Sequence, residues 1–267
     1  MYGENGKTRF EKYLARPVTP PAKELLEQIQ NPMDISKAMD PKDINQLIEC
    51  ESFEVEAGWC HKPDHTAYVA MLTKMPGVTL DMLRWWFAWH ALEDVRYQIW
   101  YPPCHYGISV SDEQRRFIAD PNVPIQEKTR EVTHFVVEDF YGRGRDVPPF
   151  NIHFRNPSYM GFDETKIDQT KIAVFCACPT PGVDVPNSGF MSSFTHVARA
   201  VEGGVELRSR FFQGYTFIDR QPVIMTSAEK PVPPKAPGLM CRHCAEEYTN
   251  LASILPEIYA EEKDNWL

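Results

Sequence analysis

Apolar and polar residues alternate along several segments of the chain, which is the pattern of strands that bury one face. These segments lie at 50–59, 65–74, 129–142, 150–155, 170–179 and 189–215. In the last segment Gly203 and Gly204 separate two alternating runs, which predicts a β-hairpin. Because the segments show neither strand–helix–strand alternation nor repeats, we expect the strands to pair antiparallel.

Two further segments have apolar residues at helical spacing. The first follows Thr79, a suitable N-cap, and continues through Trp100 until prolines 102 and 103 end it. The second covers 238–255 and follows a proline-rich connector. These are the two helices that we expect to pack on the strands.

The first 48 residues are polar, are interrupted by prolines and show no core of their own. They predict an extended N-terminal arm, 1–48, with one or two short helices over a single domain, 49–267. An α+β fold, with a curved antiparallel sheet packed around the C-terminal helix, accounts best for the order of the segments.

Composition narrows the class of protein. The 267 residues are 43% hydrophobic, enough for a substantial core, and the net charge of −9 without a basic run argues against nucleic-acid binding. The chain shows no secretion signal and no run of roughly 18 apolar residues, so we expect a soluble cytoplasmic protein without a membrane span. Seven scattered cysteines suit reduced thiols better than disulfides. A homodimer is compatible with this composition, but no segment marks an interface.

The C-terminal helix carries polar residues on its apolar stripe. His243 and Glu247 are one turn apart and share the face of Leu251 and Ile254. A pair at this spacing is usually a solvated surface contact. A carboxylate that faces a core is costly unless it is paired or binds a cation, so the position favours a metal site.

The same helix allows two other interpretations. Cys241 and Cys244 have the spacing of a zinc finger, but Cys176 and Cys178 would make a poor second pair, because alternate residues of one strand have little reach. Glu246, three residues after His243, is an alternative metal ligand. We expect most of the cysteines to be small buried residues.

Further ligands must come from elsewhere in the chain. Glu138 shares a strand face with His134, and His105 follows the end of the first helix, in a turn that leaves its ring free to orient. The other histidines are His61, His65, His90, His153 and His196.

Trp86, His90, Glu93 and Tyr97 follow one another at helical spacing. Such a stripe usually packs in a core, but its polar members also suit the wall of a cavity with aromatic sides.

Four segments together resemble the diacetylphloroglucinol hydrolase and phloretin hydrolase family. They are WWFAWH…RYQIWYPPCH at 85–105, HFVVEDF at 134–140, VELRSRFFQG at 205–214 and HCAEE at 243–247, in the same order over roughly residues 50–262. The resemblance implies a helix-grip fold similar to Bet v 1 and START proteins. It also implies zinc-dependent cleavage of the carbon–carbon bond between a polyhydroxylated aromatic ring and an acyl group.

The resemblance further implies a set of zinc ligands, with one Zn²⁺ per chain. They are His105, Glu138, His243 and Glu247. Two imidazoles and two carboxylates suit Zn²⁺, and on ligand type alone also Mn²⁺ or Fe²⁺.

Other residues match positions that the family uses for substrate or proton transfer. Tyr97 would hold a ring or ketone oxygen, and His196 would be the acid/base, although a buried, hydrogen-bonded histidine is the alternative. Tyr101 replaces a histidine of the family segment, which changes the polarity of the pocket. The residues that we expect to contact the small aromatic ketone are Trp86, His90, Tyr101 and Phe211.

Hydrolysis is the expected reaction, because a metal centre polarises a ketone and activates water, and the ring can leave as a stabilised enolate. Two other functions fit the same residues. One is metal-dependent cyclisation, aldol-type or isomerisation chemistry on an aromatic polyketide. The other is metal-free carriage of hydrophobic aromatic compounds, because helix-grip folds are often carriers.

Overall fold

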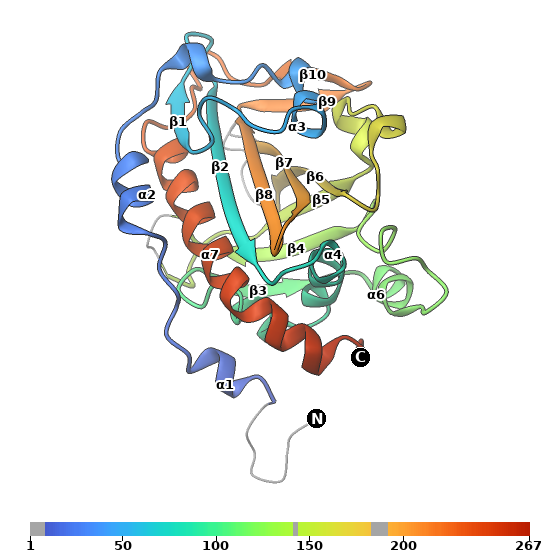
Figure 1. The fold of residues 1–267 in the computed structure, drawn as a ribbon. Helices are drawn as coiled ribbons and strands as arrows, with labels where there is room; N and C mark the ends of the chain where they lie inside the picture. The colour runs from blue at the N-terminus through green and yellow to red at the C-terminus, as the bar shows by residue number, and fades with distance from the viewer. Residues whose placement is uncertain (1–8, 141–143, 183–191) are drawn as a thin grey trace.

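An antiparallel sheet forms the body of the protein (Figure 1). The computed structural model describes residues 9–140, 144–182 and 192–267. The main sheet has the order β1-β2-β8-β7-β6-β5-β4-β3, and a separate hairpin pairs β9 with β10. The strands are β1 (Gly58–His61), β2 (Ala67–Pro76), β3 (His105–Ser109), β4 (Thr133–Glu138), β5 (Phe150–Arg155), β6 (Ile172–Pro181), β7 (Ser192–Val201), β8 (Gly204–Gln213), β9 (Tyr215–Ile218) and β10 (Gln221–Ile224).

One long helix lies along the inner side of the curved sheet (Figure 1). Strands β2 and β8 run steeply beside it, whereas β3 and β4 cross beneath, so the sheet wraps around the helix. This arrangement confirms the predicted α+β helix-grip fold. The α-helices among the described residues are α1 (Glu11–Leu14), α2 (Lys23–Gln28), α3 (Gln46–Glu49), α4 (Leu80–Trp89), α5 (Asp94–Gln98), α6 (Asp112–Ala119) and α7 (Ala236–Glu262).

Helix α7 is held against the sheet by one apolar face. Burying each large apolar side chain of this face stabilises the fold by roughly 1.5–3 kcal/mol. The predicted C-terminal helix is therefore confirmed, and it begins earlier than predicted, because Pro237 in the first turn has no donor to lose. Residues of this face that are at most 1% exposed include Cys241, Cys244, Tyr248, Leu251, Leu255 and Ile258.

The sheet has a core on each face. Leu207 of β8 belongs to the core under α7, whereas Phe212 points to the opposite side and packs with Ile44 and Leu47. Residues of the N-terminal segment thus cover the outer face of the sheet. The division of the chain at residue 48 stays a prediction.

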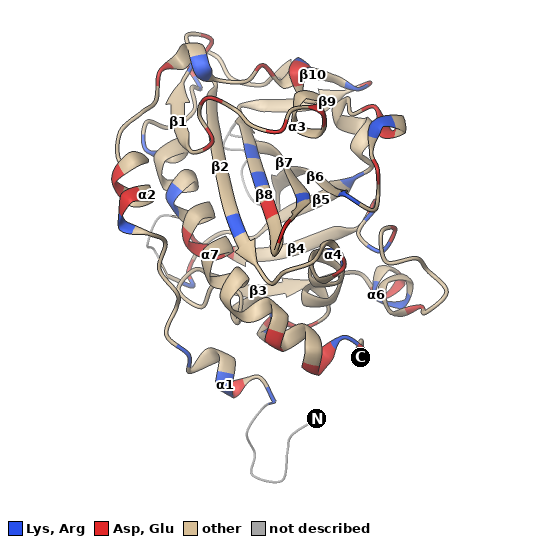
Figure 2. Cartoon of the chain, in the orientation of Figure 1, with Lys and Arg blue, Asp and Glu red and all other residues tan. Residues whose placement is uncertain are grey.

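Arg208 and Arg210 occupy the middle of β8, where two basic positions are visible in Figure 2. Alternation predicts outward salt bridges for them, but both arginines are buried, and both pair with Glu56, at 2.9 and 3.2 Å. Burial alone would raise the pKa of Glu56, yet the hydrogen bonds and charge of Arg208 lower it.

The predicted strand at 50–59 is largely wrong. Only its last residues enter β1, because Glu56 turns inward to the two arginines and accepts the backbone N–H of Phe53 at 3.1 Å.

The predicted helix to Trp100 is interrupted. Helix α4 ends at Trp89, a 3₁₀ turn follows, and Glu93 is extended, with φ −150°. The buried guanidinium of Arg96 donates to the Trp89 carbonyl at 3.2 Å, and that carbonyl would otherwise accept the N–H of Glu93 in a continuous helix. Glu93 therefore leaves the predicted stripe, and Asp94 accepts the N–H of Ile108 at 2.7 Å.

The predicted β-hairpin at Gly203 is confirmed. Gly203 adopts φ 77° in the turn, and Gly204 already belongs to β8, where a Cβ would collide with the backbone oxygen of Met75. Strand β3, helix α6 and the β9–β10 hairpin were not predicted. They are short, and the hairpin turn uses Asp219 and Arg220 at positive φ rather than glycine.

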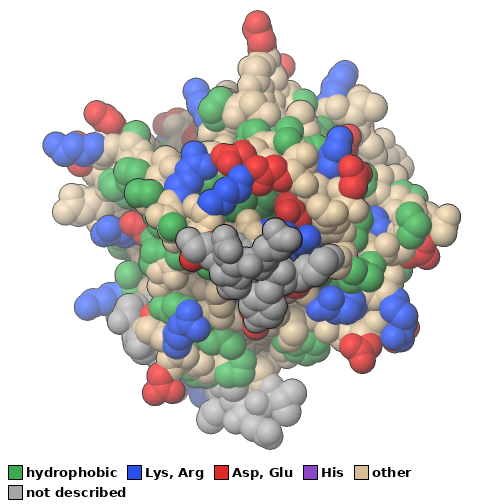
Figure 3. Space-filling view, turned by 90° about the horizontal axis from the view of Figure 1, so that it is seen from below, with side chains coloured by type: hydrophobic (Ala, Val, Ile, Leu, Met, Phe, Trp, Pro, Cys, Tyr) green, Lys and Arg blue, Asp and Glu red, His purple; other side chains and the backbone are tan. Residues whose placement is uncertain are grey.

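Acidic and basic side chains are mixed on the face seen from below in Figure 3. Exposed ion pairs such as Lys12–Glu257 and Arg16–Glu257, both at 3.1 Å, join the N-terminal segment to α7. Each exposed pair contributes at most about 1 kcal/mol. No helix within the described ranges has both the length and the apolar character of a transmembrane span.

We predict that Glu56→Gln lowers the free energy of unfolding by about 3 kcal/mol, because it leaves the buried guanidinium of Arg210 without its carboxylate and that of Arg208 with Glu206 alone. Urea denaturation measures the change. The control is Glu54→Gln, whose exposed pair with Lys37 contributes little. Equal stabilities of the two variants would contradict the prediction.

Candidate metal centre and substrate cavity

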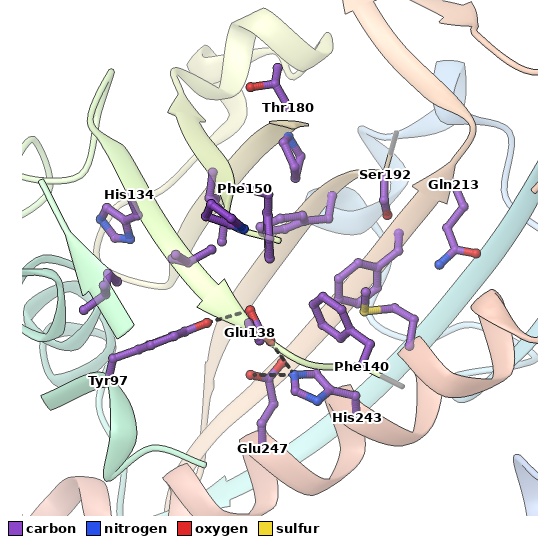
Figure 4. A pocket seen from close by; sticks show the side chains of 18 of the residues that line it. Tyr97, His134, Glu138, Phe140, Phe150, Thr180, Ser192, Gln213, His243 and Glu247 are labelled. Carbon is purple, nitrogen blue, oxygen red and sulfur yellow. Dashed lines mark hydrogen bonds and ion pairs between the residues drawn. The ribbon is translucent and has the colours of Figure 1, made fainter. Parts of the chain in front are cut away.

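A cavity of about 590 Å³ lies between α7 and the sheet. Its walls are mainly aromatic and apolar, and its polar residues include His90, Tyr97, His134 and His196. Glu138, His243 and Glu247 lie together at one part of the wall (Figure 4). The cavity therefore combines a large apolar volume with a compact group of ionisable side chains.

Three elements bring four ionisable residues together. His105 opens β3 and pairs across the strands with Glu138, the last residue of β4, while α7 supplies His243 and Glu247 from successive turns. One ligand atom from each residue lies within 4.8 Å of the others, and all four residues are at most 8% exposed. The closest contact joins His243 Nε2 to Glu138 Oε1 at 2.7 Å.

The two ring nitrogens that face this group, His105 Nε2 and His243 Nε2, lie close to carboxylate oxygens but make no hydrogen bond of good geometry within the described residues. The His105 Nδ1–H donates to the Tyr97 carbonyl at 3.2 Å, so the lone pair of a neutral ring points at Nε2 toward the carboxylates. Lone pairs and carboxylates that face one another repel unless a proton or a metal ion lies between them. Two imidazoles and two carboxylates are ligands that divalent zinc accepts, so these residues fit a metal ion.

The electrostatics of the four side chains also favour positive charge at their centre. Burial would lower the pKa of His105, but the charge of Glu138 outweighs burial and the pKa is raised. The pKa of His243 is raised well above its usual range, because Glu247 outweighs the same penalty. Burial would raise the pKa of Glu138 and Glu247, but the neighbouring imidazoles lower both.

Aromatic side chains that surround the four ionisable residues fix their orientation. Tyr97 donates its O–H to Glu138 Oε2 at 2.6 Å, and its ring is stacked on His105 with centroids 4.0 Å apart. Trp100 Nε1 donates to the backbone oxygen of Glu247 at 3.1 Å. His105 lies in a strand rather than in the predicted free turn, so its ring direction is fixed by these contacts.

His196 also faces the cavity and lies between two hydroxyl groups. Its Nδ1 is 2.7 Å from Ser209 Oγ, and its Nε2 is 3.0 Å from the Tyr248 hydroxyl. Burial lowers the pKa of His196 to about 4, so the ring is neutral near pH 7. Tyr248 was not predicted, although it follows Glu247 directly and shares the buried side of α7.

The four residues predicted to contact substrate do not all reach the cavity. His90 and Phe211 line it. Trp86 does not, because it is packed among Trp85, Trp89 and Trp100 in the core. Tyr101 also lies outside the lining, where its hydroxyl donates to Glu246 at 2.7 Å and its ring meets those of His105 and His243 edge-on.

The alternative ligands lie elsewhere. Glu246 is occupied by Tyr101 and by Arg242 at 2.8 Å. Cys241 and Cys244 are buried as free thiols, and neither belongs to the described group that could hold a metal. His134 was not assigned a role, yet it lines the cavity, and its Nε2 has no partner within the described ranges.

Fold and centre together define a helix-grip protein with two histidines and two carboxylates buried beside an aromatic cavity. The chain belongs to the DAPG hydrolase family, whose PhiG domain matches residues 39–260.

The relatives are similar over nearly the whole chain. The phloretin hydrolase of Eubacterium ramulus is 34% identical over 98% of this chain and 93% of that protein. A 2,4-diacetylphloroglucinol hydrolase of a Pseudomonas species is 28% identical over 94% and 87%, respectively. Among solved structures, Ara h 8.0201 is 10% identical, with a TM-score of 0.43, and the match covers 72% of this chain and 99% of that one.

We predict that His134 makes stability pH-dependent. Burial lowers its pKa well below the usual 6.5, so the unfolded chain takes up a proton that the folded protein does not, and stability falls as the pH falls below about 6.5. His134→Leu should reduce the slope of unfolding free energy between pH 5.5 and 4.5 by about 1.4 kcal/mol per pH unit. Urea denaturation across this range measures the slope. His61→Leu, which removes an exposed ring, should keep the wild-type slope, and an unchanged slope in His134→Leu would contradict the prediction.

Proposed function

We propose that this protein is a metal-dependent hydrolase that cleaves the carbon–carbon bond between an acyl group and a polyhydroxylated aromatic ring. The observation that carries the proposal is the meeting of His105, Glu138, His243 and Glu247 beside an aromatic cavity. Membership of the DAPG hydrolase family and the names of the relatives, phloretin and 2,4-diacetylphloroglucinol hydrolases, support the same reaction.

The four residues would hold one zinc ion. When bound, zinc supplies a Lewis acid that polarises a ketone and lowers the pKa of water. Tyr97 and Trp100 fix the direction of the ligands, and the aromatic walls exclude bulk water from around them. With Zn²⁺ bound, the two carboxylates would make the site formally neutral, which suits an uncharged ketone.

The proposed reaction balances without a further reactant. The substrate ring adopts its keto tautomer at the acylated carbon, and the oxygen of water bonds to the acyl carbon. The bond between the acyl carbon and the ring breaks, and its electron pair passes into the ring as an enolate. One proton of water reaches the enolate oxygen, which gives a carboxylic acid and a phenol.

His196 is suited to move this proton. Its neutral ring, hydrogen-bonded to Tyr248 and Ser209, can accept a proton at one nitrogen and return it from the same wall of the cavity. Tyr97 would hold a ring hydroxyl of the substrate: its own proton is donated to Glu138, so its oxygen can accept a hydrogen bond from a phenolic O–H, and its side chain lines the cavity.

We predict about one zinc ion per chain in the protein purified without chelator. His243→Ala should weaken zinc binding more than about tenfold, because it removes a direct ligand. Elemental analysis and competition with a chromophoric chelator measure content and affinity. The control is Glu246→Gln. Glu246 lies on the same helix but pairs with Arg242 and is not one of the four ligands, so this variant should bind zinc normally. A wild type that binds no zinc would favour a carrier instead.

We further predict that incubation with acylphloroglucinols releases the free acid and phloroglucinol, and that a chelator stops the release. Tyr97→Phe should lower kcat about 10- to 100-fold, because it removes the hydrogen bond that orients Glu138. Tyr106→Phe, whose hydroxyl donates to the Pro103 carbonyl, is the matched control. Chromatography of the products decides the reaction: a rearranged ketone without released acid would indicate cyclase or isomerase chemistry.

A further inference from the structure

Gln213 is a completely buried glutamine whose amide makes no hydrogen bond within the described residues. It is 0% exposed, and both its oxygen and its nitrogen lack a partner. Buried amides are almost always paired, and Gln213 lines the cavity, so its missing partner is expected to come from the cavity side.

The alternation along β7 and β8 fixes the direction of this side chain. Ser209 and Phe211 face the cavity side, where Ser209 meets His196, and Gln213 continues the same row. Ser192 lies directly opposite Gln213 on β7, also lines the cavity and also has an unpartnered hydroxyl. Figure 4 shows Ser192 and Gln213 together at one end of the cavity.

This polar end is set apart from the metal centre along α7. Gln213 pairs with Ala67 of β2, and Ala67 packs with Ala236, the first residue of α7. His243 follows seven residues later on the helix, about 10 Å away along its axis. In Figure 4, Glu138 and Glu247 likewise lie well away from Gln213.

The wall of this part of the cavity is apolar. Met240 lines it from α7, and Phe194 and Phe211 line it next to Ser192 and Gln213. None of the described residues that line the cavity is lysine or arginine, so a carboxylate or phosphate there would lack a counter-charge. A hydroxyl group can both donate to the amide oxygen and accept from an amide N–H, so it can pair with both groups of Gln213.

We propose that Gln213, with Ser192, forms a subsite for a neutral hydroxyl at the far end of the acyl group. The inference rests on the proposed function, and it names the substrate class as phloroglucinol ketones whose acyl chain ends in a hydroxyaryl group. An acetyl group would be too short to reach Gln213 from the metal centre.

Two ketones that differ in one hydroxyl test the subsite: 3-(4-hydroxyphenyl)propanoyl-phloroglucinol and 3-phenylpropanoyl-phloroglucinol. The wild type should show at least about tenfold higher kcat/KM for the hydroxylated ketone, because the analogue leaves the amide unpaired. Gln213→Leu should bring the ratio close to one. Gln221→Leu, which removes an exposed amide on β10, should keep the wild-type ratio.

A wild-type ratio near one, or a ratio unchanged in Gln213→Leu, would overturn the subsite. If Gln213→Leu does not fold, Gln213→Met, with an unbranched side chain, takes its place. If neither ketone is cleaved, the proposed function fails instead. In that case, calorimetry measures the affinity of each ketone for the wild type and for the variant. The ratio of the two affinities then tests the subsite in the same way.

Discussion

The burial of two carboxylates beneath α7 is the constraint on which the arrangement of this protein depends. Glu138 and Glu247 are at most 8% exposed, and an isolated carboxylate in such a place costs several kcal/mol. The cost is offset only if the end of β4, the start of β3 and the first turns of α7 meet closely enough for His105 and His243 to lie between the two carboxylates. The packing of three elements that are distant in sequence is thus tied to one electrostatic requirement.

A chain of hydrogen bonds extends this requirement to the N-terminal segment. The backbone N–H of Thr19 donates to the Asn250 side chain at 2.9 Å, Asn250 donates to the Trp100 carbonyl at 2.7 Å, and Trp100 donates to the backbone of Glu247. Asn250 and Glu247 lie on α7, whereas Thr19 and Trp100 lie outside the helices and strands, so these bonds tie two loop segments to α7 and help to fix its rotation and height. The segment that the sequence describes as an arm therefore also supports the helix that carries two of the four ionisable residues.

The sequence predicts best where one local pattern decides the structure. The stripe of α7 places His243 and Glu247 on a buried face, and alternation predicts β5 and the β7–β8 hairpin. The sequence predicts poorly where a distant group competes with a local bond. Helix α4 ends at Trp89 because Arg96 donates to the Trp89 carbonyl. Glu56 lies outside β1 because it pairs with two arginines. Trp86 keeps the predicted spacing but faces tryptophans instead of the cavity. Spacing gives the face of a helix, and only the tertiary packing decides what that face meets.

The polar atoms that line the cavity have a different relation to stability. His105 and His243 gain from the carboxylates beside them, whereas His134 Nε2 and the Gln213 amide are buried without a partner among the described residues and lower the stability of the fold. Such groups persist in a folded protein when the surrounding packing outweighs their cost, and here that packing is the two-sided sheet and the aromatic cluster around Trp86 and Trp89. The same packing that holds the ionisable centre together therefore also keeps a few uncharged polar atoms facing an apolar cavity. A neutral, mostly aromatic ligand with separated hydroxyl groups matches that distribution, because it can pair with them without bringing a charge into the cavity.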